Sequence, residues 1–237
     1  MPDLDPEVPA AFVTSGSDQG IVAARFRVVS AAAEAFSVLA NGSHTAGYIL
    51  RNEQSLALAL LCHIATSITN GLLALLRATN TYAAAALLRQ LIEVEYLLFL
   101  GYSDRTNLVT WYRSDRKTRV AQFSPQRMRD ASGGLFRDQE YWQHCESGGH
   151  PTPAARVVLN GYAGGIEPMH FLLPDSVHHL RRLWVSMRSC AEDLLEVGGP
   201  YRDAAARLDA AIDAWTALEH PIVLSFDGIA DEPDEVP

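Results

Sequence analysis

The chain has 237 residues, 48% of them hydrophobic, which is enough for one large domain or two small ones to bury a sizeable core. Its 28 acidic residues outnumber its 19 basic ones, and the net charge of -9 argues against wholesale coating of nucleic acid or of an anionic membrane. The three cysteines are widely spaced and odd in number, so the sequence indicates neither a disulfide framework nor a thiolate zinc site. A reducing cytoplasm fits this composition best.

Helical patterns dominate the chain, and no pair of strands joined by a hairpin turn is evident, so the predicted fold class is all-α. Residues 1–17 are acidic and proline-bearing and lack the features of a secretory signal, so we expect them to be disordered. A single helical bundle of about seven helices is expected over residues 18–222. The acidic tail over residues 223–237 is expected to be disordered as well.

The first three predicted helices are long. The first begins at Asp18, an N-cap residue type, and stops at Asn41-Gly42. The second covers about 47–78, where Asn70-Gly71 can loosen or kink it, and the third covers about 80–101. The second and third are rich in alanine and leucine and have little polar face, which is typical of the central helices of a bundle.

One segment of the second helix is apolar enough to need a comparison with membrane helices. Residues 54–76 contain no Asp, Glu, Lys or Arg and are long enough to span a bilayer. Several polar side chains interrupt the segment, and burying them in lipid is costly. We therefore favour a buried central helix over a transmembrane one and expect no membrane partner.

The second half of the chain predicts shorter helices. One follows from about 105, and Ser124-Pro125 is a start signal for the next, with the serine as N-cap and the proline at the first helical position. The segment LFRDQEYWQHCES predicts another helix. Residues 149–174 carry four prolines and read as one long irregular connection. Two final helices are expected, beginning at Asp175 and Pro200.

Three charged residues stand out in the apolar third helix. Arg89 and Glu93 are four residues apart and therefore share a face on which they can pair. Two interpretations stay open: a buried ion pair that fixes helix register, or a polar cleft in which Arg89 binds an anion. Glu95 lies on a different side, so it has to reach water or meet a positive group on another element. The positively charged residues nearest to Glu95 in the sequence, outside its own helix, are the arginines of residues 105–137.

Residues 105–137 hold eight basic residues and only two aspartates, with aromatic residues between them. Such a segment can hold a phosphate backbone and stack bases, which makes RNA a candidate partner. The competing interpretation is a solvated surface that pairs with the acidic tail or with another subunit. The predicted nucleic-acid-binding residues are Arg113, Arg116, Lys117, Arg119, Arg127 and Arg129.

The segment RDQEYWQH places Arg137 and His144 seven residues apart, or two helical turns, on the same side of a helix. An arginine, the polar residue Asp138 and then a histidine resemble the motif of the HEPN superfamily, small helical domains that include many metal-independent ribonucleases of bacterial toxin and defence systems. The resemblance implies that Arg137 holds the phosphate and that His144 helps to activate the ribose 2′-hydroxyl, in a site completed by a second subunit.

The wider region, from LLRQLIE to YWQHCESGGHP, also resembles a group of uncharacterised bacterial helical proteins. These proteins have an R-x-x-x-E helix followed by an aromatic helix and a histidine. No activity carries over from that group, but the resemblance singles out His150 beside His144. Tyr141, in the aromatic segment, is a supporting residue.

A metal site is the competing interpretation of the carboxylates and histidines, because these are the ligand types of di-metal helical bundles. Only one E-x-x-H is present, and Pro168 within it argues against the helix that such a site needs. We therefore expect no metal or cofactor. The adjacent pair His178-His179 points in different directions on a helix and is expected to serve packing or the surface. The candidate ligands are Glu93, Glu95, Glu140, His144, Glu167 and His170.

The sequence lacks the phosphate-binding loops and nucleophile elbow of nucleotide-fold enzymes and α/β hydrolases. The leading hypothesis is a cytoplasmic, homodimeric HEPN-like domain that cleaves or binds RNA. The alternative is a non-catalytic interaction protein with a protein partner. In the leading hypothesis the catalytic residues are Arg137 and His144, and the supporting or anion-binding residues are Arg89, Glu93, Tyr141 and His150.

Overall fold

A computed structural model describes residues 19–161, 167–194 and 199–223, and this part of the chain is helical without any strand. The predicted all-α class is therefore confirmed. The expected number of about seven helices is too low, because the described residues form ten α-helices. The predicted disordered segments, residues 1–17 and 223–237, lie outside the described residues apart from Val223, which ends the last helix.

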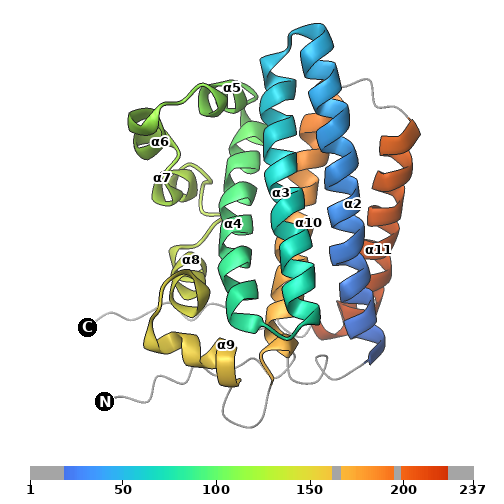
Figure 1. Cartoon of the computed structure of the whole chain (residues 1–237), viewed down its shortest axis with the longest axis vertical. Coiled ribbons are helices and arrows are strands. Elements are labelled where there is room, and N and C mark those ends of the chain that lie inside the picture. The colour runs from blue at the N-terminus through green and yellow to red at the C-terminus, as the bar shows by residue number, and fades with distance from the viewer. Residues whose placement is uncertain (1–18, 162–166, 195–198, 224–237) are drawn as a thin grey trace.

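Five long helices run side by side and form the body of the protein (Figure 1). Helix α2 packs against α3 and α11, and α10 packs against α4 and α2. Apolar side chains from all five helices form one continuous core, in which Phe36, Leu58 and Leu88 are fully buried. The five are α2 (Gln19–Leu50), α3 (Glu53–Arg77), α4 (Thr81–Ser103), α10 (Met169–Leu194) and α11 (Gly199–Val223).

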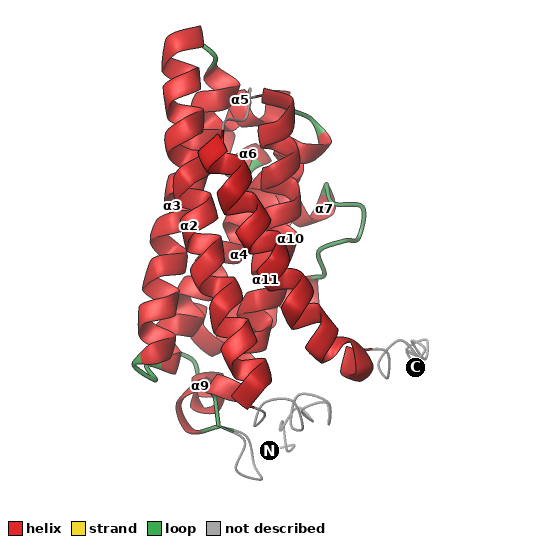
Figure 2. Ribbon diagram, turned by 90° about the vertical axis from the view of Figure 1, so that its right-hand side faces the viewer, coloured by secondary structure: helices red, strands yellow, loops and turns green. Residues whose placement is uncertain are grey.

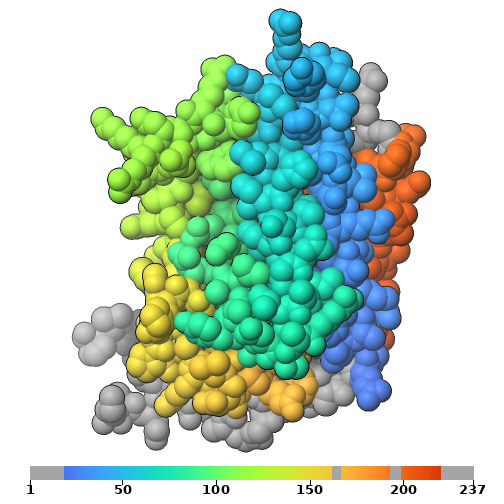
Figure 3. Space-filling model, in the orientation of Figure 1, coloured from blue at the N-terminus to red at the C-terminus, as the bar shows by residue number. Residues whose placement is uncertain are grey.

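Short helices occupy the flank of α4 that faces away from α2 (Figure 1). In the space-filling view α5 and α6 stand out at one side of the bundle (Figure 3). The predicted helix from about 105 is in fact two helices, since Asp115 starts a new one by accepting a hydrogen bond from the Thr118 N–H. The short helices are α5 (Thr106–Tyr112), α6 (Arg116–Gln122), α7 (Pro125–Asp130), α8 (Asp138–His144) and α9 (Arg156–Asn160).

Two predicted helix boundaries are wrong for identifiable reasons. Helix α2 continues past Asn41-Gly42 to Leu50, because glycine inside a helix costs only about 1 kcal/mol, which tertiary packing can outweigh. Helix α10 begins at Met169 and contains Pro174. This proline lies near the helix start, where the loss of one backbone hydrogen bond is tolerated. As a consequence, Asp175 lies inside α10 and does not cap it.

The region expected to be one irregular connection also contains structure. A π-helical turn (Cys145–Gly149) extends α8, and a 3-10 turn (Pro153–Ala155) leads directly into α9. Only residues 162–166 of the predicted connection lie outside the described part of the chain. The loop prediction followed the prolines, but Pro153 sits at the first position of its turn, where a missing N–H costs nothing.

One described helix, α3, is long and apolar enough to cross a membrane by length and composition. Just over half of its most apolar window, 56%, is buried inside the protein. Figure 2 shows α3 lying alongside α2 in the bundle. Its N-cap is Asn52, whose side chain accepts hydrogen bonds from the N–H groups of Gln54 and Ser55.

Candidate functional site: a carboxylate-histidine cluster beside a pocket

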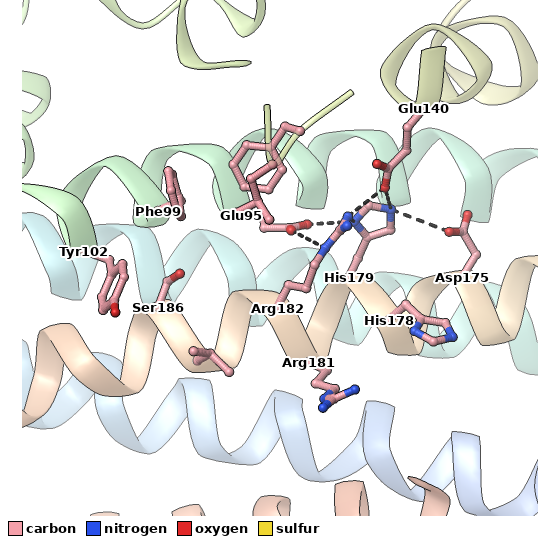
Figure 4. A pocket seen from close by; sticks show the side chains of 13 residues that line it. Glu95, Phe99, Tyr102, Glu140, Asp175, His178, His179, Arg181, Arg182 and Ser186 are labelled. Carbon is pink, nitrogen blue, oxygen red and sulfur yellow. Dashed lines mark hydrogen bonds and ion pairs between the residues drawn. The ribbon is translucent and has the colours of Figure 1, made fainter. Parts of the chain in front are cut away.

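A cluster of ionisable side chains lies between α4, α8 and α10, where the surrounding core is apolar (Figure 4). Helix α4 contributes one carboxylate, α8 a carboxylate and a histidine, and α10 a carboxylate, a histidine and an arginine. We call this group the polar cluster. Its members are Glu95, Glu140, His144, Asp175, His179 and Arg182.

Helical spacing accounts for the local part of this arrangement. Asp175, His179 and Arg182 follow one another at intervals of four and three residues, so they project from one face of α10. Glu140 and His144 are four residues apart and share a face of α8. The packing of α10 against α4 then brings Glu95 to the same point.

The two histidines present their Nε2 atoms to each other. His179 Nε2 lies 3.4 Å from His144 Nε2 and 3.5 Å from the Oε1 atom of Glu140. The three donor atoms of Glu140, His144 and His179 all lie within 4.8 Å of one another. His179 is almost fully buried, with 1% of its side chain exposed, whereas the other two are partly buried.

The opposite nitrogen of each imidazole faces a carboxylate. His179 Nδ1 lies 2.7 Å from Glu95 Oε2, and His144 Nδ1 lies 3.7 Å from Asp175 Oδ2. A proton on Nδ1 that is donated to the carboxylate leaves Nε2 as a free lone pair. A glutamate thus holds the Nδ1 atom of His179, Asp175 lies near the Nδ1 atom of His144 beyond hydrogen-bond distance, and the two Nε2 atoms face each other.

Arg182 joins the two glutamates of the cluster. Its Nε lies 2.7 Å from Glu95 Oε1 and its Nη2 donates to Glu140 Oε1 over 2.7 Å. The Nη2 atom also lies 2.9 Å from His179 Nδ1. It can donate to Nδ1 only in the tautomer without an Nδ1 proton, so Arg182 and Glu95 compete for this nitrogen. Any group that binds Nε2 selects the tautomer that donates to Glu95.

Burial sets the protonation of the two innermost members. It raises the pKa of Glu95 to about 8, although the Arg182 guanidinium opposes the shift. It also lowers the pKa of His179 to about 4, so this imidazole is neutral at pH 7. For Glu140, burial favours the neutral acid, but the charge and hydrogen bond of Arg182 outweigh it and the pKa is lowered. Burial acts to lower the pKa of the Arg182 guanidinium, but the carboxyl groups of Glu95 and Glu140 outweigh it and the pKa is raised.

A pocket of about 650 Å³ opens beside the polar cluster. Its polar lining comprises five members of the cluster together with His178, Arg181 and Ser186 (Figure 4). The rest of its wall is formed by apolar and aromatic side chains of α4, α10 and the segment before α8. A concave site of this size with a few convergent polar groups is the usual form of a small-molecule site. Its apolar wall consists of Phe99, Tyr102, Leu135, Phe136 and Val185.

Three of the sequence-predicted residues meet in a second group on the other side of α4. Arg89 Nη2 lies 2.8 Å from Glu93 Oε1 and donates to the Tyr141 hydroxyl over 2.9 Å. The hydroxyl in turn donates to Glu93 Oε1 over 3.1 Å. We call Arg89, Glu93 and Tyr141 the arginine-tyrosine group. Its charges balance internally, which favours the first of the two interpretations, a pair that fixes helix packing.

Glycines of the π-helical turn allow this group to form. A Cβ atom on Gly149 would lie 2.4 Å from the Arg89 Cδ atom, and one on Gly148 would lie 2.6 Å from the Ala85 backbone. The turn therefore approaches α4 as closely as only glycine permits. The Cys145 Sγ atom, in the same turn, accepts a hydrogen bond from Arg89 Nε over 3.3 Å.

The two residues of the predicted catalytic pair have different surroundings. His144 belongs to the polar cluster, whereas Arg137 is the exposed N-cap residue of α8 and makes no side-chain hydrogen bond or ion pair with any described residue. The expected placement of both residues on one side of a helix is wrong, because α8 begins only at Asp138. His150 is exposed and lies outside the polar cluster.

The predicted nucleic-acid-binding residues divide into two classes. Arg116, Lys117, Arg119 and Arg127 are exposed, although Arg119 donates to the Ser114 carbonyl. Arg113 is engaged by Glu53 of α3 at 2.6 Å. Arg129 is only 5% exposed, since its guanidinium lies over the Tyr141 ring and pairs with Asp138. The assignment of Arg129 to the RNA-facing surface is therefore wrong.

Sequence reasoning missed the α10 half of the polar cluster. His179 was expected to serve packing or the surface, and the partner of Glu95 was sought in residues 105–137, but it is Arg182. The signal that could have found it is the set Asp175, His179 and Arg182 on one face of an amphipathic helix. Of the other candidate metal ligands, Glu167 precedes α10 and His170 lies in its first turn, and both are outside the group of three ligands.

No protein-family model, curated protein or solved structure matches this chain.

Proposed function

We propose that this protein binds one divalent transition-metal ion through Glu140, His144 and His179, and that the ion forms an open, catalytic-type centre at the polar end of the pocket. The observation that carries the proposal is the spacing of the donor atoms, 3.4 and 3.5 Å for the two contacts of His179 Nε2. Ligands held about 2.0–2.1 Å from a tetrahedral zinc ion lie about 3.4 Å apart.

The carboxylates behind the histidines support the same proposal. Histidines that bind metals nearly always donate their other ring N–H to a carboxylate, a carbonyl or water, which fixes the ring and its tautomer. Glu95 occupies this position behind His179 at 2.7 Å. Asp175 lies between the two histidines, with Oδ2 3.7 Å from His144 Nδ1 and Oδ1 3.5 Å from His179 Nε2. The cluster therefore contains both ligands and the groups that orient them.

The charges of the cluster also suit a cation. Glu140 is held in the ionised form and His179 in the neutral form at pH 7, which are the states that bind metals. Glu140 and Asp175 also bring carboxylates to the two histidines, against the one guanidinium of Arg182. Glu95, with a pKa of about 8, is mainly the neutral acid at pH 7, and a divalent cation nearby favours its ionised form.

Three protein ligands leave a coordination position for water or a substrate, which distinguishes catalytic sites from closed structural ones. A bound zinc ion supplies a water of pKa about 7 and polarises carbonyl oxygens. In this chain the pocket is lined by two of the three proposed ligands, Glu140 and His179, so a molecule in the pocket would lie beside a metal ion held by them. Metal-assisted attack of water on a small substrate is the reaction class that this arrangement fits.

Zinc titration of chelator-treated protein by calorimetry tests the proposal. We expect one equivalent to bind to the wild-type protein and none to bind stoichiometrically to His144→Ala, which removes a ligand. Asp175→Asn should weaken binding about tenfold, since groups that orient metal ligands typically contribute 10–100-fold in affinity. His150→Ala, which changes an exposed histidine of the same region, is the matched control and should bind as the wild type does. Stoichiometric zinc binding by His144→Ala would refute the assignment.

RNA cleavage or binding by a HEPN-like site is the second candidate function. It is supported by exposed basic side chains that make no ion pair with a described residue, namely Arg116, Lys117, Arg127 and Arg137. The decisive experiment is cleavage of labelled single-stranded RNA in the presence of a chelator, with Arg137→Ala and His144→Ala for comparison. Chelator-resistant cleavage that both variants lose would favour this function over the metal centre. The expected homodimer and a protein partner stay predictions.

A further inference from the structure

We infer that the pocket takes an amphiphilic small molecule whose oxygen-bearing head binds at the metal centre and whose acyl or aryl tail lies along Phe99, Leu135 and Val185. This inference rests on the proposed metal centre and goes beyond it, because it names the chemical class of the ligand. A carbonyl-containing head, as in a carboxylate, an amide or a hydroxamate, suits the open coordination position.

The pocket is divided along its length into a polar end and an apolar end. Figure 4 shows Glu140 and Asp175 beside His179 at one end, and Phe99 and Tyr102 further along α4 at the other. From Glu95 to Tyr102 the helix rises about 10 Å, at about 1.5 Å per residue. A ligand that spans both ends therefore needs a polar head and an apolar part about as long as this distance.

The apolar end of the pocket is partly open to solvent. Tyr102 is 47% exposed, Leu135 50% and Val185 58%, and all three line this one pocket. They come from α4, from the segment before α8 and from α10, so no single helix face explains their grouping. Exposed apolar side chains that converge from separate segments mark a binding surface. A ligand tail would remove them from water.

The size of the pocket agrees with a small molecule as its occupant. A volume of about 650 Å³ lies within the range of roughly 300–1,000 Å³ that drug-sized ligands occupy. The metal centre lies at one end of this volume, and a macromolecular partner would leave that end unfilled. The polar residues at this end include Arg182, which is already engaged by Glu95 and Glu140 and therefore does not select a free anion by itself.

The experiment compares two probes of equal head chemistry on zinc-loaded full-length protein. Acetohydroxamate carries a metal-binding head without a tail, and octanohydroxamate adds an apolar chain. We expect octanohydroxamate to bind at least about 30-fold more tightly, because each buried methylene adds affinity. The double variant Leu135→Gln/Val185→Gln should lose most of this ratio, and both changes are at exposed positions where folding tolerates polar residues. Leu159→Gln, at a position 60% exposed and outside the pocket, is the matched control.

Zinc titration of the same samples separates the two proposals. Stoichiometric zinc binding with equal affinities for the two hydroxamates would overturn the ligand class and leave the metal centre intact. Tail-dependent binding that the double variant retains would also overturn it, since the tail would then lie elsewhere. If no zinc binds, both proposals fail together. The supporting result is a chain-length preference that the double variant loses while its zinc affinity stays at the wild-type value.

Discussion

The arginine-tyrosine group and the polar cluster both include residues of helix α4. They differ in how exposed their side chains are and in how far apart their members lie in the sequence. The arginine-tyrosine group has a pair from successive turns, Arg89 and Glu93, with 23% and 32% of their side chains exposed. In the polar cluster, Glu95 and His179 are each 1% exposed and come from distant parts of the chain. The charges of Arg89 and Glu93 neutralise each other within α4. The polar cluster forms only when α10 packs on α4.

This difference indicates which group has a role beyond packing. A self-contained ion pair needs no outside charge to be tolerated, and a structural role accounts for it. The polar cluster gathers three carboxylates, two histidines and one arginine at a buried point, at a high desolvation cost. Five of its six residues, all except His144, also line the pocket, whereas none of Arg89, Glu93 and Tyr141 does. Buried ionisable groups with perturbed pKa values beside a pocket mark functional sites.

The largest expected effect comes from replacing Glu95, which contacts both His179 and Arg182 in the polar cluster. Glu95→Ala leaves the Arg182 guanidinium and the His179 imidazole without their shared carboxylate. Because Glu95 has a pKa of about 8 and is mainly the neutral acid at pH 7, the loss is that of a buried hydrogen-bonding partner, and we expect the free energy of unfolding to fall by about 3 kcal/mol. Urea unfolding in the presence of a chelator measures this value.

Glu95→Gln provides the control for that loss, since it keeps the shape of the side chain and can still hydrogen-bond to His179. We expect it to cost less than Glu95→Ala. Equal losses in the two variants would mean that cavity formation, and not the missing carboxylate, dominates the effect. A loss below about 0.5 kcal/mol for Glu95→Ala would place the polar cluster among ordinary surface groups.

Zinc should stabilise the protein through the polar cluster and not through the arginine-tyrosine group. At a free concentration 100 times its Kd, zinc is expected to raise the free energy of unfolding by about 2.7 kcal/mol, because it binds the folded state. His144→Ala should abolish the gain, and Arg89→Met should retain it, since Arg89 lies outside the cluster. Urea unfolding with zinc and with a chelator measures both. An equal gain in the His144→Ala variant would mean that zinc binds elsewhere.

The two groups also show how much of the candidate site could be predicted from the sequence. The pair of Arg89 and Glu93 follows from helical periodicity, which relates residues four apart without any tertiary information. The need of Glu95 for a positive partner was equally clear from its apolar surroundings. The identity of the partner was not, because Arg182 approaches only through the packing of α10 on α4, and sequence distance favoured the arginines of residues 105–137.

The same limit applies to the fold. The long apolar helices and the all-α class follow from composition and periodicity, and Ser124-Pro125 correctly marked the start of α7. Proline was the misleading signal elsewhere, because Pro174 lies inside α10 where an N-terminal boundary was expected. That error placed Asp175 at a cap and hid its alignment with His179 and Arg182. Tertiary packing decides whether a proline near a helix start ends the helix, and local sequence does not record it.

The smallest expected effect comes from a substitution in the arginine-tyrosine group. Tyr141→Phe removes a hydroxyl that accepts from Arg89 and donates to Glu93, while the ring keeps its place under the Arg129 guanidinium. We expect a loss of about 1 kcal/mol in the free energy of unfolding, the usual value for one hydrogen bond, since the pair of Arg89 and Glu93 remains. Zinc affinity should not change. Tyr112→Phe, at an exposed position, is the matched control for urea unfolding. A change in zinc affinity in Tyr141→Phe would show that the two groups on α4 are coupled through α8, and the division between a packing group and a functional one would then fail.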